Sequence, residues 1–212
     1  MKTFLTRDGL ADLITYVSEA MMASKDSLCE LDSIIGDGDL GVTCTLGFGA
    51  VKKCAQTGGQ ADVQALLLGC GMAFADNAAS TFGSLMSTMF IRAGRAVKGK
   101  TEIWPSEAAA MLQSAVEGIE QRGKAQLGDK TMLDSLIPAS LALTKAAAEG
   151  HTLPDCLAAA CDAAKAGAEE TISLRSRAGR SEWMGDRTVG VKDAGAVAVV
   201  LLIEAAQRFV NV

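Results

Sequence analysis

The sequence predicts an all-α protein, a fold class that three features of the chain indicate. Hydrophobic residues make up 49% of the 212 residues, but aromatic residues make up only 4%. Alanine dominates many stretches, which favours closely packed helices over sheets, because sheets select β-branched and aromatic side chains. Apolar residues recur at helical spacing, and no alternating strand pattern persists between turn signals. Since no Pro/Ser-rich linker divides the chain, we expect one domain over residues 1–212.

Helical periodicity places about eight helices along the chain. Their expected ranges are 7–25, 42–57, 62–77, 83–98, 105–122, 131–149, 153–172 and 193–209. The second segment has one apolar face, formed by Val42, Leu46, Phe48 and Val51. The fourth segment has a similar face, formed by Leu85, Met89, Ile91, Ala93, Ala96 and Val97. Both patterns are typical of amphipathic helices.

Boundary signals define the later helices. Pro105 and Pro154 stand at first helical turns, where the missing N–H is not needed. Two threonines are each followed three residues later by an aspartate, as in a capping box. These pairs are Thr131 with Asp134 and Thr152 with Asp155. Pro138 predicts a kink or a late start in the sixth helix, and Gly150 and Gly179 fit C-terminal stops.

Composition excludes several classes of protein. The net charge of -5 argues against nucleic acid or an anionic membrane as the main partner. The N-terminus lacks the apolar core of a signal peptide, and the longest apolar run, residues 196–203, is too short to span a bilayer. Six cysteines without CxxC spacing favour buried thiols in a reducing compartment over disulfides. We therefore expect a cytoplasmic protein.

The most informative feature is a cluster of three aspartates, Asp32, Asp37 and Asp39, with glycines on both sides of Asp37. Two like charges ~4 Å apart repel by about 4 kcal/mol at an effective dielectric constant near 20. A divalent cation removes this repulsion, and carboxylate oxygens suit Mg²⁺ or Ca²⁺. A helix expected to begin near Val42 would favour a phosphate at the same place. The cluster therefore indicates a magnesium–nucleotide site.

Two other interpretations of the aspartate cluster are a solvated turn and an EF-hand loop. Aspartates in a loop are most often solvated turn or cap residues, so the local pattern alone does not decide. An EF-hand fails on spacing: counted from Asp37, the sixth position is Val42 rather than Gly, and the twelfth is Phe48 rather than Glu.

Residues 94–101 match the phosphate-binding string GxxxxGK[ST], but their context argues against that function. The motif requires a strand before the loop and a helix after it. Here the preceding residues form an amphipathic helical pattern, so we expect a basic helix end with a solvated loop. His151, the single histidine, lies between two expected helices and is expected at the surface, which argues against a histidine-dependent triad or metal site.

Three further segments make a family resemblance specific: residues 83–94, 128–139 and 179–196. Together with the aspartate cluster, they occur in the order and spacing of the nucleotide-binding L domain of dihydroxyacetone kinases. The resemblance runs nearly end to end. Since no sugar-binding K domain precedes the matched region, the chain is similar to a free-standing L subunit.

The resemblance implies a barrel of about eight antiparallel helices with the nucleotide at one end. It implies that Asp32, Asp37 and Asp39 hold a pair of Mg²⁺ ions that bridge the diphosphate of ADP or ATP. The implied nucleotide contacts are Leu40, Gly41, Val42, Thr43, Thr81, Phe82, Gly123, Met132, Arg180, Asp193, Ala194 and Gly195. Arg180 suits a phosphate or a base face, and Met132 suits a pliable adenine contact.

Five positions depart from the family pattern. Many members have His at the position of Leu40 and Pro at that of Ala194. Where many members have Gly-Thr-Ser-Gly-Pro-Leu, this chain has Ser80-Thr81-Phe82-Gly83-Ser84-Leu85, so Ser80, Phe82 and Ser84 differ. These changes leave the metal ligands unaltered but change the contacts available near the γ-phosphate. The resemblance therefore fixes neither the sugar nor the phosphate donor.

The implied activity is that of a kinase subunit that transfers phosphate from Mg-bound nucleotide to dihydroxyacetone or a related short ketose. The ketose would be held on a separate K-type subunit, so we expect activity only with that partner. In phosphoenolpyruvate-dependent systems an M-type phosphocarrier subunit rephosphorylates bound ADP. Two alternatives stay open: a subunit of an ATP-dependent kinase for a ketose such as erythrulose, and a nucleotide-loaded regulatory module without catalysis. A homo-oligomer is also left open.

Overall fold

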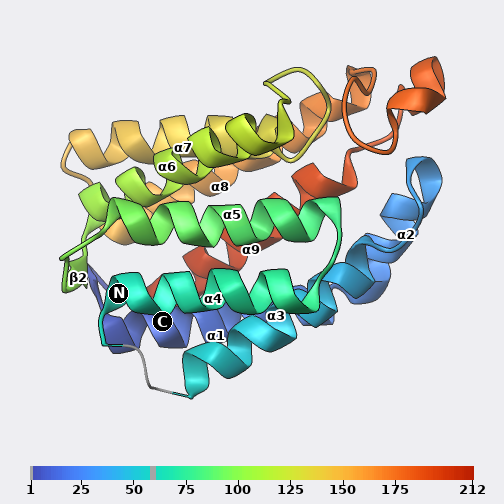
Figure 1. Cartoon of the computed structure of the whole chain (residues 1–212). Helices are drawn as coiled ribbons and strands as arrows, with labels where there is room; N and C mark the ends of the chain where they lie inside the picture. Colours follow the sequence, from blue (N-terminus) through green and yellow to red (C-terminus); the bar gives the residue numbers. More distant parts are fainter. Residues whose placement is uncertain (1, 58–60) are drawn as a thin grey trace.

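The computed structural model describes residues 2–57 and 61–212, and these residues are mostly helical (Figure 1). The α-helices are α1 (Arg7–Ala23), α2 (Lys25–Ile35), α3 (Leu40–Gln56), α4 (Val63–Asn77), α5 (Thr81–Ala96), α6 (Pro105–Gly123), α7 (Leu133–Ala148), α8 (Leu153–Glu170) and α9 (Ala194–Asn211). The 3-10 helices are η1 (Thr171–Ser173) and η2 (Glu182–Thr188). Two-residue strands β1 (Leu5–Thr6) and β2 (Glu102–Ile103) pair antiparallel. The prediction of a helical protein is confirmed.

The long helices pack in a closed sequence. Helix α1 packs on α3, each helix from α3 to α8 packs on the next one in the chain, and α9 packs on both α8 and α1. Figure 1 shows neighbouring helices running in opposite directions, with the chain termini and β2 at one end of the molecule. The opposite end, on the right of that view, carries α2, the loop after α6, and η2. The starts of α3, α5, α7 and α9 therefore share that end.

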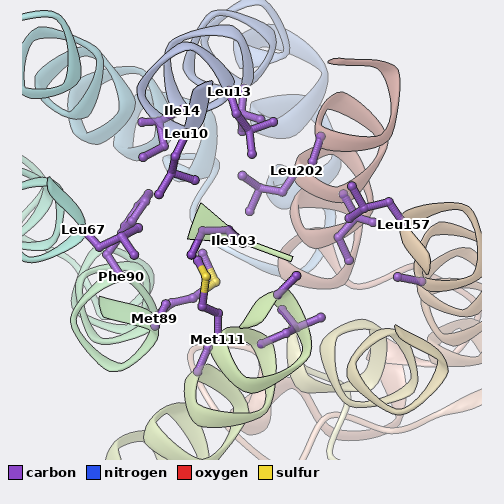
Figure 2. Close-up of a pocket in the computed structure, with 18 of the residues that line it drawn as sticks. Leu10, Leu13, Ile14, Leu67, Met89, Phe90, Ile103, Met111, Leu157 and Leu202 are labelled. Carbon is purple, nitrogen blue, oxygen red and sulfur yellow. The ribbon is translucent and has the colours of Figure 1, made fainter. Parts of the chain in front are cut away.

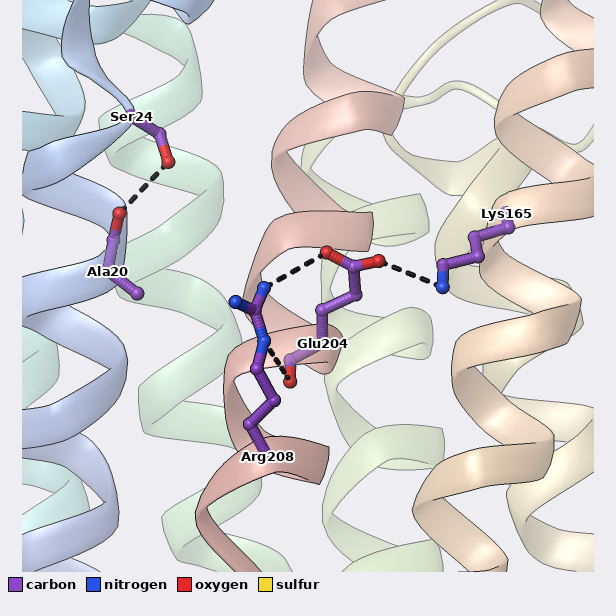
Figure 3. Close-up of polar contacts among 5 residues, drawn as sticks. All are labelled: Ala20, Ser24, Lys165, Glu204 and Arg208. Carbon is purple, nitrogen blue, oxygen red and sulfur yellow. Dashed lines mark hydrogen bonds and ion pairs between the residues drawn. The ribbon is translucent and has the colours of Figure 1, made fainter.

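Helix α2 was missed by the sequence analysis, which expected one helix over residues 7–25. Helix α1 ends at Ala23: Ser24 has a ψ of 8°, outside the helical range, although its amide still donates to the Ala20 carbonyl oxygen at 3.2 Å. The Ser24 hydroxyl donates to the same oxygen at 2.9 Å (Figure 3). A separate helix begins at Lys25. As a result, Asp32 lies on a helix rather than in a loop.

Helix α7 contains Pro138 yet runs without interruption from Leu133 to Ala148. Proline has no N–H to donate to the carbonyl four residues earlier, which is that of Asp134. Gly167 of α8 lies against this carbonyl, since a Cβ at Gly167 would be 2.0 Å from the Asp134 oxygen. The glycine therefore allows α8 to approach α7 closely where α7 begins.

The remaining boundary predictions gave mixed results. Pro105 begins α6 as expected, and the Thr152 hydroxyl accepts from the Asp155 amide at 3.4 Å. Helix α7 begins at Leu133, so Thr131 is not its cap residue. Gly179 does not end a helix; it lies in the turn between η1 and η2.

The interior contains an apolar cavity of about 220 Å³ (Figure 2). Side chains from most of the long helices and from both strands line it, including Leu10, Leu67, Met89, Phe90, Ile103, Met111, Leu157 and Leu202. Ser18 is a polar member of the lining, and its hydroxyl donates to the Ile14 carbonyl at 2.7 Å. Among the described residues, none that lines this cavity is charged, and the cavity lies among core side chains.

Helix α9 is the one helix of the described residues with the length and composition to cross a membrane. It packs against α1, α7 and α8. Its Glu204 carboxylate binds Lys165 of α8 at 2.8 Å and Arg208 at 3.2 Å (Figure 3). A core helix of a helical bundle has the same length and composition, and the ion pairs on α9 fit that role.

Candidate functional site

The three predicted metal ligands converge at the end of the molecule that carries α2. Asp32 lies on the last turn of α2, and Asp37 and Asp39 lie in the turn that leads into α3. Oxygens from the three carboxylates lie within 4.8 Å of one another. Carboxylate oxygens in such a cluster are the ligands that Mg²⁺ prefers, so the donor set fits this ion.

Two glycines make the convergence of the carboxylates possible. A Cβ at Gly36 would lie 2.2 Å from the Asp32 Oδ1 atom. Gly38 has a φ of 74°, in the left-handed region that a side chain disfavours. The turn that follows Asp32 can therefore fold back toward α2, where the Leu40 amide donates to Asp32 Oδ2 at 3.3 Å.

Arg180 brings a cation to the carboxylates. Its guanidinium contacts the Asp37 carboxylate and lies 3.7 Å from the Asp39 Oδ2 atom. The Arg180 side chain is 56% exposed, in the turn before η2. The guanidinium therefore neutralises part of the cluster while staying accessible to a ligand from solvent.

Four helix N-termini meet around this cluster, those of α3, α5, α7 and α9. Caps hold two of them: the Ser80 hydroxyl accepts from the Gly83 amide at 2.9 Å, and Asp193 Oδ2 accepts from the Ala196 amide at 2.7 Å. The N-terminal end of a helix dipole favours an anion. The site thus combines carboxylates that suit a metal with helix ends that suit phosphate.

A cavity of about 190 Å³ lies between these elements. Beside the three aspartates, the predicted contact residues in its lining are Leu40, Thr81, Phe82, Gly123, Met132, Arg180, Asp193 and Gly195. The predicted residues outside its lining are Gly41, Val42, Thr43 and Ala194. Gly41 is held against α2, since a Cβ there would lie 2.0 Å from the Lys25 carbonyl oxygen. Thr43 and Ala194 are buried, while Val42 is exposed.

The lining also contains residues that the sequence analysis did not assign to the site. They are Gly36, Ser80, Leu85, Ala125, Lys130, Thr131, Ala178, Gly179 and Ser181. Several directly neighbour predicted residues, so the family motifs could have indicated them. Lys130 is different, because its side chain is buried and lysine is almost always exposed. No local pattern marks such a residue.

The Lys130 ammonium interacts with two carboxylates, those of Asp134 and Asp193. Burial raises the pKa of the Asp193 carboxyl to about 7, and donation from the Ala196 amide opposes this increase. The nearby Asp134 carboxylate raises the pKa of Asp193 further, and the Lys130 ammonium lowers it. Burial lowers the pKa of Lys130, against the effect of Asp193 and Asp134.

Lys100, the lysine of the GxxxxGK[ST] string, lies outside this cavity. Its ammonium pairs with Glu107 at 2.9 Å, and this contact holds the pKa of the Glu107 carboxyl below its usual range. The string begins inside α5, without a preceding strand. Its interpretation as a helix end with a solvated loop agrees with the structure. His151 likewise lies exposed after α7, as expected.

Comparison with known proteins identifies the family of this chain. The model of the DAK2 domain matches residues 34–208. The chain belongs to the DAK2 domain family. Among curated members, it is 30% identical to the ADP-binding subunit DhaL of PEP-dependent dihydroxyacetone kinase from Escherichia coli strain K12, over 94% of this chain and 95% of that protein. It is 34% identical to the ADP-binding subunit DhaL of a second such kinase from Listeria innocua, over 84% of this chain and 83% of that protein.

Other proteins match this chain over only about a third of their own length. The L-erythrulose kinase of Pectobacterium atrosepticum is 29% identical over 95% of this chain but only 35% of its own length. A crystal structure of the dihydroxyacetone kinase from C. freundii in complex with AMP-PNP and Mg²⁺ matches with a TM-score of 0.74 and 26% identity. That match covers 93% of this chain and 33% of the kinase, so the chain spans about a third of it.

Proposed function

We propose that this chain is the ADP- or ATP-binding subunit of a multi-subunit kinase for dihydroxyacetone or a related short ketose. The observation that carries the proposal is the convergence of Asp32, Asp37 and Asp39 at a cavity bordered by helix N-termini. The similarity to proteins named ADP-binding subunits supports it, because the match spans nearly the whole of one of them. We further propose that residues 1–212 form one L-type domain, a barrel of about eight helices with the nucleotide at one end, that acts in the cytoplasm.

Each part of the site has a proposed task. Asp32, Asp37 and Asp39 would hold Mg²⁺, a pair of ions by analogy with the family, and the metal would neutralise charge on the phosphates. The N-termini of α3 and α5, at residues 40–43 and 81–82, would donate backbone N–H groups to phosphate oxygens. Arg180 would supply a second, exchangeable positive charge. Met132 and Gly123, with the 193–195 turn, would border the nucleoside.

The sugar substrate requires a second polypeptide in this proposal. Phosphoryl transfer by positioning needs the acceptor hydroxyl within reach of the phosphorus. The cavity offers no histidine that could capture the ketose covalently, because His151, the single histidine of the chain, lies outside the lining. A K-type subunit would therefore bring the ketose, and an M-type phosphocarrier would rephosphorylate bound ADP. The two bacterial relatives are both named as subunits of PEP-dependent kinases, which favours a phosphocarrier over free ATP as the phosphate donor.

One alternative has specific support. Three relatives at 28–30% identity are named erythrulose kinases, and Leu40, Phe82 and Ala194 depart from the pattern of many family members. The alternative is a subunit that exchanges ATP in each turnover and serves a four-carbon ketose.

The nucleotide released from freshly purified protein separates these modes. Denaturation should release about one ADP per chain if the nucleotide is a retained cofactor, whereas an empty site that exchanges ATP indicates the alternative. A second assay tests the kinase itself: the chain with a K-type subunit and a phosphate donor should phosphorylate dihydroxyacetone. The chain alone should not, and robust phosphorylation by the isolated chain would contradict the split site.

A further inference from the structure

Lys130 is a buried lysine at the inner wall of the candidate nucleotide cavity. It is 2% exposed and lies in the loop between α6 and α7. Its φ of 60° falls in the left-handed region, which costs a residue with a side chain about 1 kcal/mol or more. Burial of an ammonium is also unfavourable unless it is paired and hydrogen-bonded. Two unfavourable features in one residue indicate that its surroundings hold it in place.

The Lys130 ammonium joins segments far apart in the chain. It donates to the carbonyl oxygens of Thr171, in η1, and of Val191, just before α9. These carbonyls lie 41 and 61 residues later in the sequence. Between them the chain forms the turn that carries Arg180. One side chain therefore connects the loop before α7 with both ends of the segment that supplies Arg180 and Asp193.

The carboxylates near Lys130 hold the same segments. Asp134 accepts from the Gly128 amide at 2.7 Å and from the Thr131 amide at 2.6 Å, which fixes the loop on either side of Lys130. The Asp193 amide donates to the Thr171 hydroxyl at 2.9 Å, and its carboxylate caps α9. The ammonium interacts electrostatically with both of these acidic groups. Lys130 is thus the centre of a polar network that includes both loops.

We infer that Lys130 is a positioning residue for nucleotide: its contacts hold the 124–132 loop and the 171–193 segment in the arrangement that forms the cavity. The inference rests on the proposed function, since it concerns nucleotide at that site. Loops that are ordered before binding do not lose conformational freedom when the ligand arrives, which strengthens affinity. Lys130 acts through Met132, Arg180 and Asp193 rather than through its own contact with phosphate.

The test compares two variants of equal side-chain length. Lys130→Met removes the donors and the charge, whereas Lys130→Gln keeps N–H donors for the carbonyls of Thr171 and Val191. Calorimetric titration with ADP in the presence of Mg²⁺ should show about tenfold or greater loss of affinity for Lys130→Met. Lys130→Gln should recover part of that loss. Lys100→Met, at an exposed lysine paired with Glu107, is the matched control and should bind as the unmodified chain does.

Hydrogen exchange separates positioning from a general structural role. Without nucleotide, Lys130→Met should exchange faster in residues 124–132 and 171–193 and at unchanged rates in α1, α3 and α4. Equal affinities of both Lys130 variants and the unmodified chain would overturn the inference alone. So would faster exchange throughout the chain, failure of both variants to fold, or a Gln variant as weak as the Met variant. If the unmodified chain does not bind Mg-ADP, the proposed function and this inference both fail.

Discussion

The Arg180 guanidinium contacts the Asp37 carboxylate and lies 3.7 Å from Asp39 Oδ2, so one side chain partly neutralises two of the three predicted metal ligands. This places a cation of the protein where the proposal places Mg²⁺. Arg180 and the metal would therefore compete for the carboxylates until a nucleotide brings phosphates that attract both.

The first prediction follows from that competition. Arg180→Met should strengthen the binding of Mg²⁺ alone, because a competing cation is gone, but weaken the binding of ADP with Mg²⁺, because a counter-charge to phosphate is lost. The gain in the free energy of Mg²⁺ binding should be modest, on the order of 1 kcal/mol or less, since exposed ion pairs are weak. Isothermal calorimetry measures the affinity for Mg²⁺ alone and the affinity for ADP with Mg²⁺. Arg175→Met, which removes an exposed pair with Asp186 in the same segment, is the control, and changes of the same sign for both ligands would contradict the model.

The second prediction compares two candidate phosphate-binding loops. Asp37→Ala should abolish binding of ADP with Mg²⁺, because it removes a proposed metal ligand and the contact with Arg180. Lys100→Ala should leave binding unchanged, since Lys100 pairs with Glu107 outside the cavity. Titration of both variants with the same nucleotide decides the matter. The reverse ranking would show that the GxxxxGK[ST] string is the binding loop after all.

The third prediction concerns removal of the metal. A ligand that binds only the folded state stabilises it by about 2.7 kcal/mol when present at 100 times its Kd. For a domain of this size that corresponds to an increase of roughly 5–10 °C in the melting temperature. Chelation of Mg²⁺ should remove this increase and release nucleotide. Equal melting temperatures with and without Mg²⁺ and ADP would rule out a metal–nucleotide site.

Local patterns predicted the parts of this structure that are formed locally. The cluster of Asp32, Asp37 and Asp39 was predictable because these residues lie close together in the sequence. The glycines on both sides of Asp37 indicate a turn there. Helix α2 was not predicted, because the first expected helix ended at residue 25 and the aspartate cluster was placed in a loop, whereas Lys25–Ile35 form a helix. The break between α1 and α2 involves a single residue, Ser24, whose ψ of 8° is not helical, and a periodicity argument does not detect it.

Lys130 shows the limit of local patterns more clearly. Its partners are the carbonyls of Thr171 and Val191, so its burial depends on how distant segments meet. Nothing in the neighbouring sequence distinguishes it from an exposed lysine. The family motifs similarly indicated Met132 and Arg180, but not that residues 41–43 would lie outside the cavity lining. Residues 41–43 lie outside the lining because α3 packs on α2, with Gly41 close to the Lys25 carbonyl.

The fourth prediction concerns pH. Burial raises the pKa of Asp193 from 3.8 to about 7 in the folded protein. Between these values the folded state binds more protons at Asp193 than the unfolded chain does, so its contribution to stability falls as pH rises. The decrease is at most about 4 kcal/mol. Asp193→Asn should remove this decrease in stability with rising pH. The substitution should keep the cap of α9, because asparagine also caps helices. Urea unfolding of both proteins at several pH values, without divalent metal, measures the difference, and identical pH dependence would contradict it.

The last prediction concerns the packing that supports the site. Gly167→Ala would place a Cβ 2.0 Å from the Asp134 carbonyl oxygen and 3.2 Å from the Ser135 Cα. Backbone atoms cannot turn away as a side chain can, so α8 must move from α7, and we expect a loss of about 1–3 kcal/mol in the free energy of unfolding.

Gly49 of α3 provides the matched control for Gly167. A Cβ at Gly49 would meet only the Met22 sulfur, at 3.8 Å. Alanine is the better helix former by about 1 kcal/mol, so Gly49→Ala should stabilise the protein. Urea denaturation of the two variants should therefore give changes of opposite sign. Because Asp134 also holds the loop that carries Lys130, Gly167→Ala should weaken the binding of ADP with Mg²⁺ as well. A variant that is less stable but binds ADP normally would show that the close approach of α8 to α7 serves the fold alone.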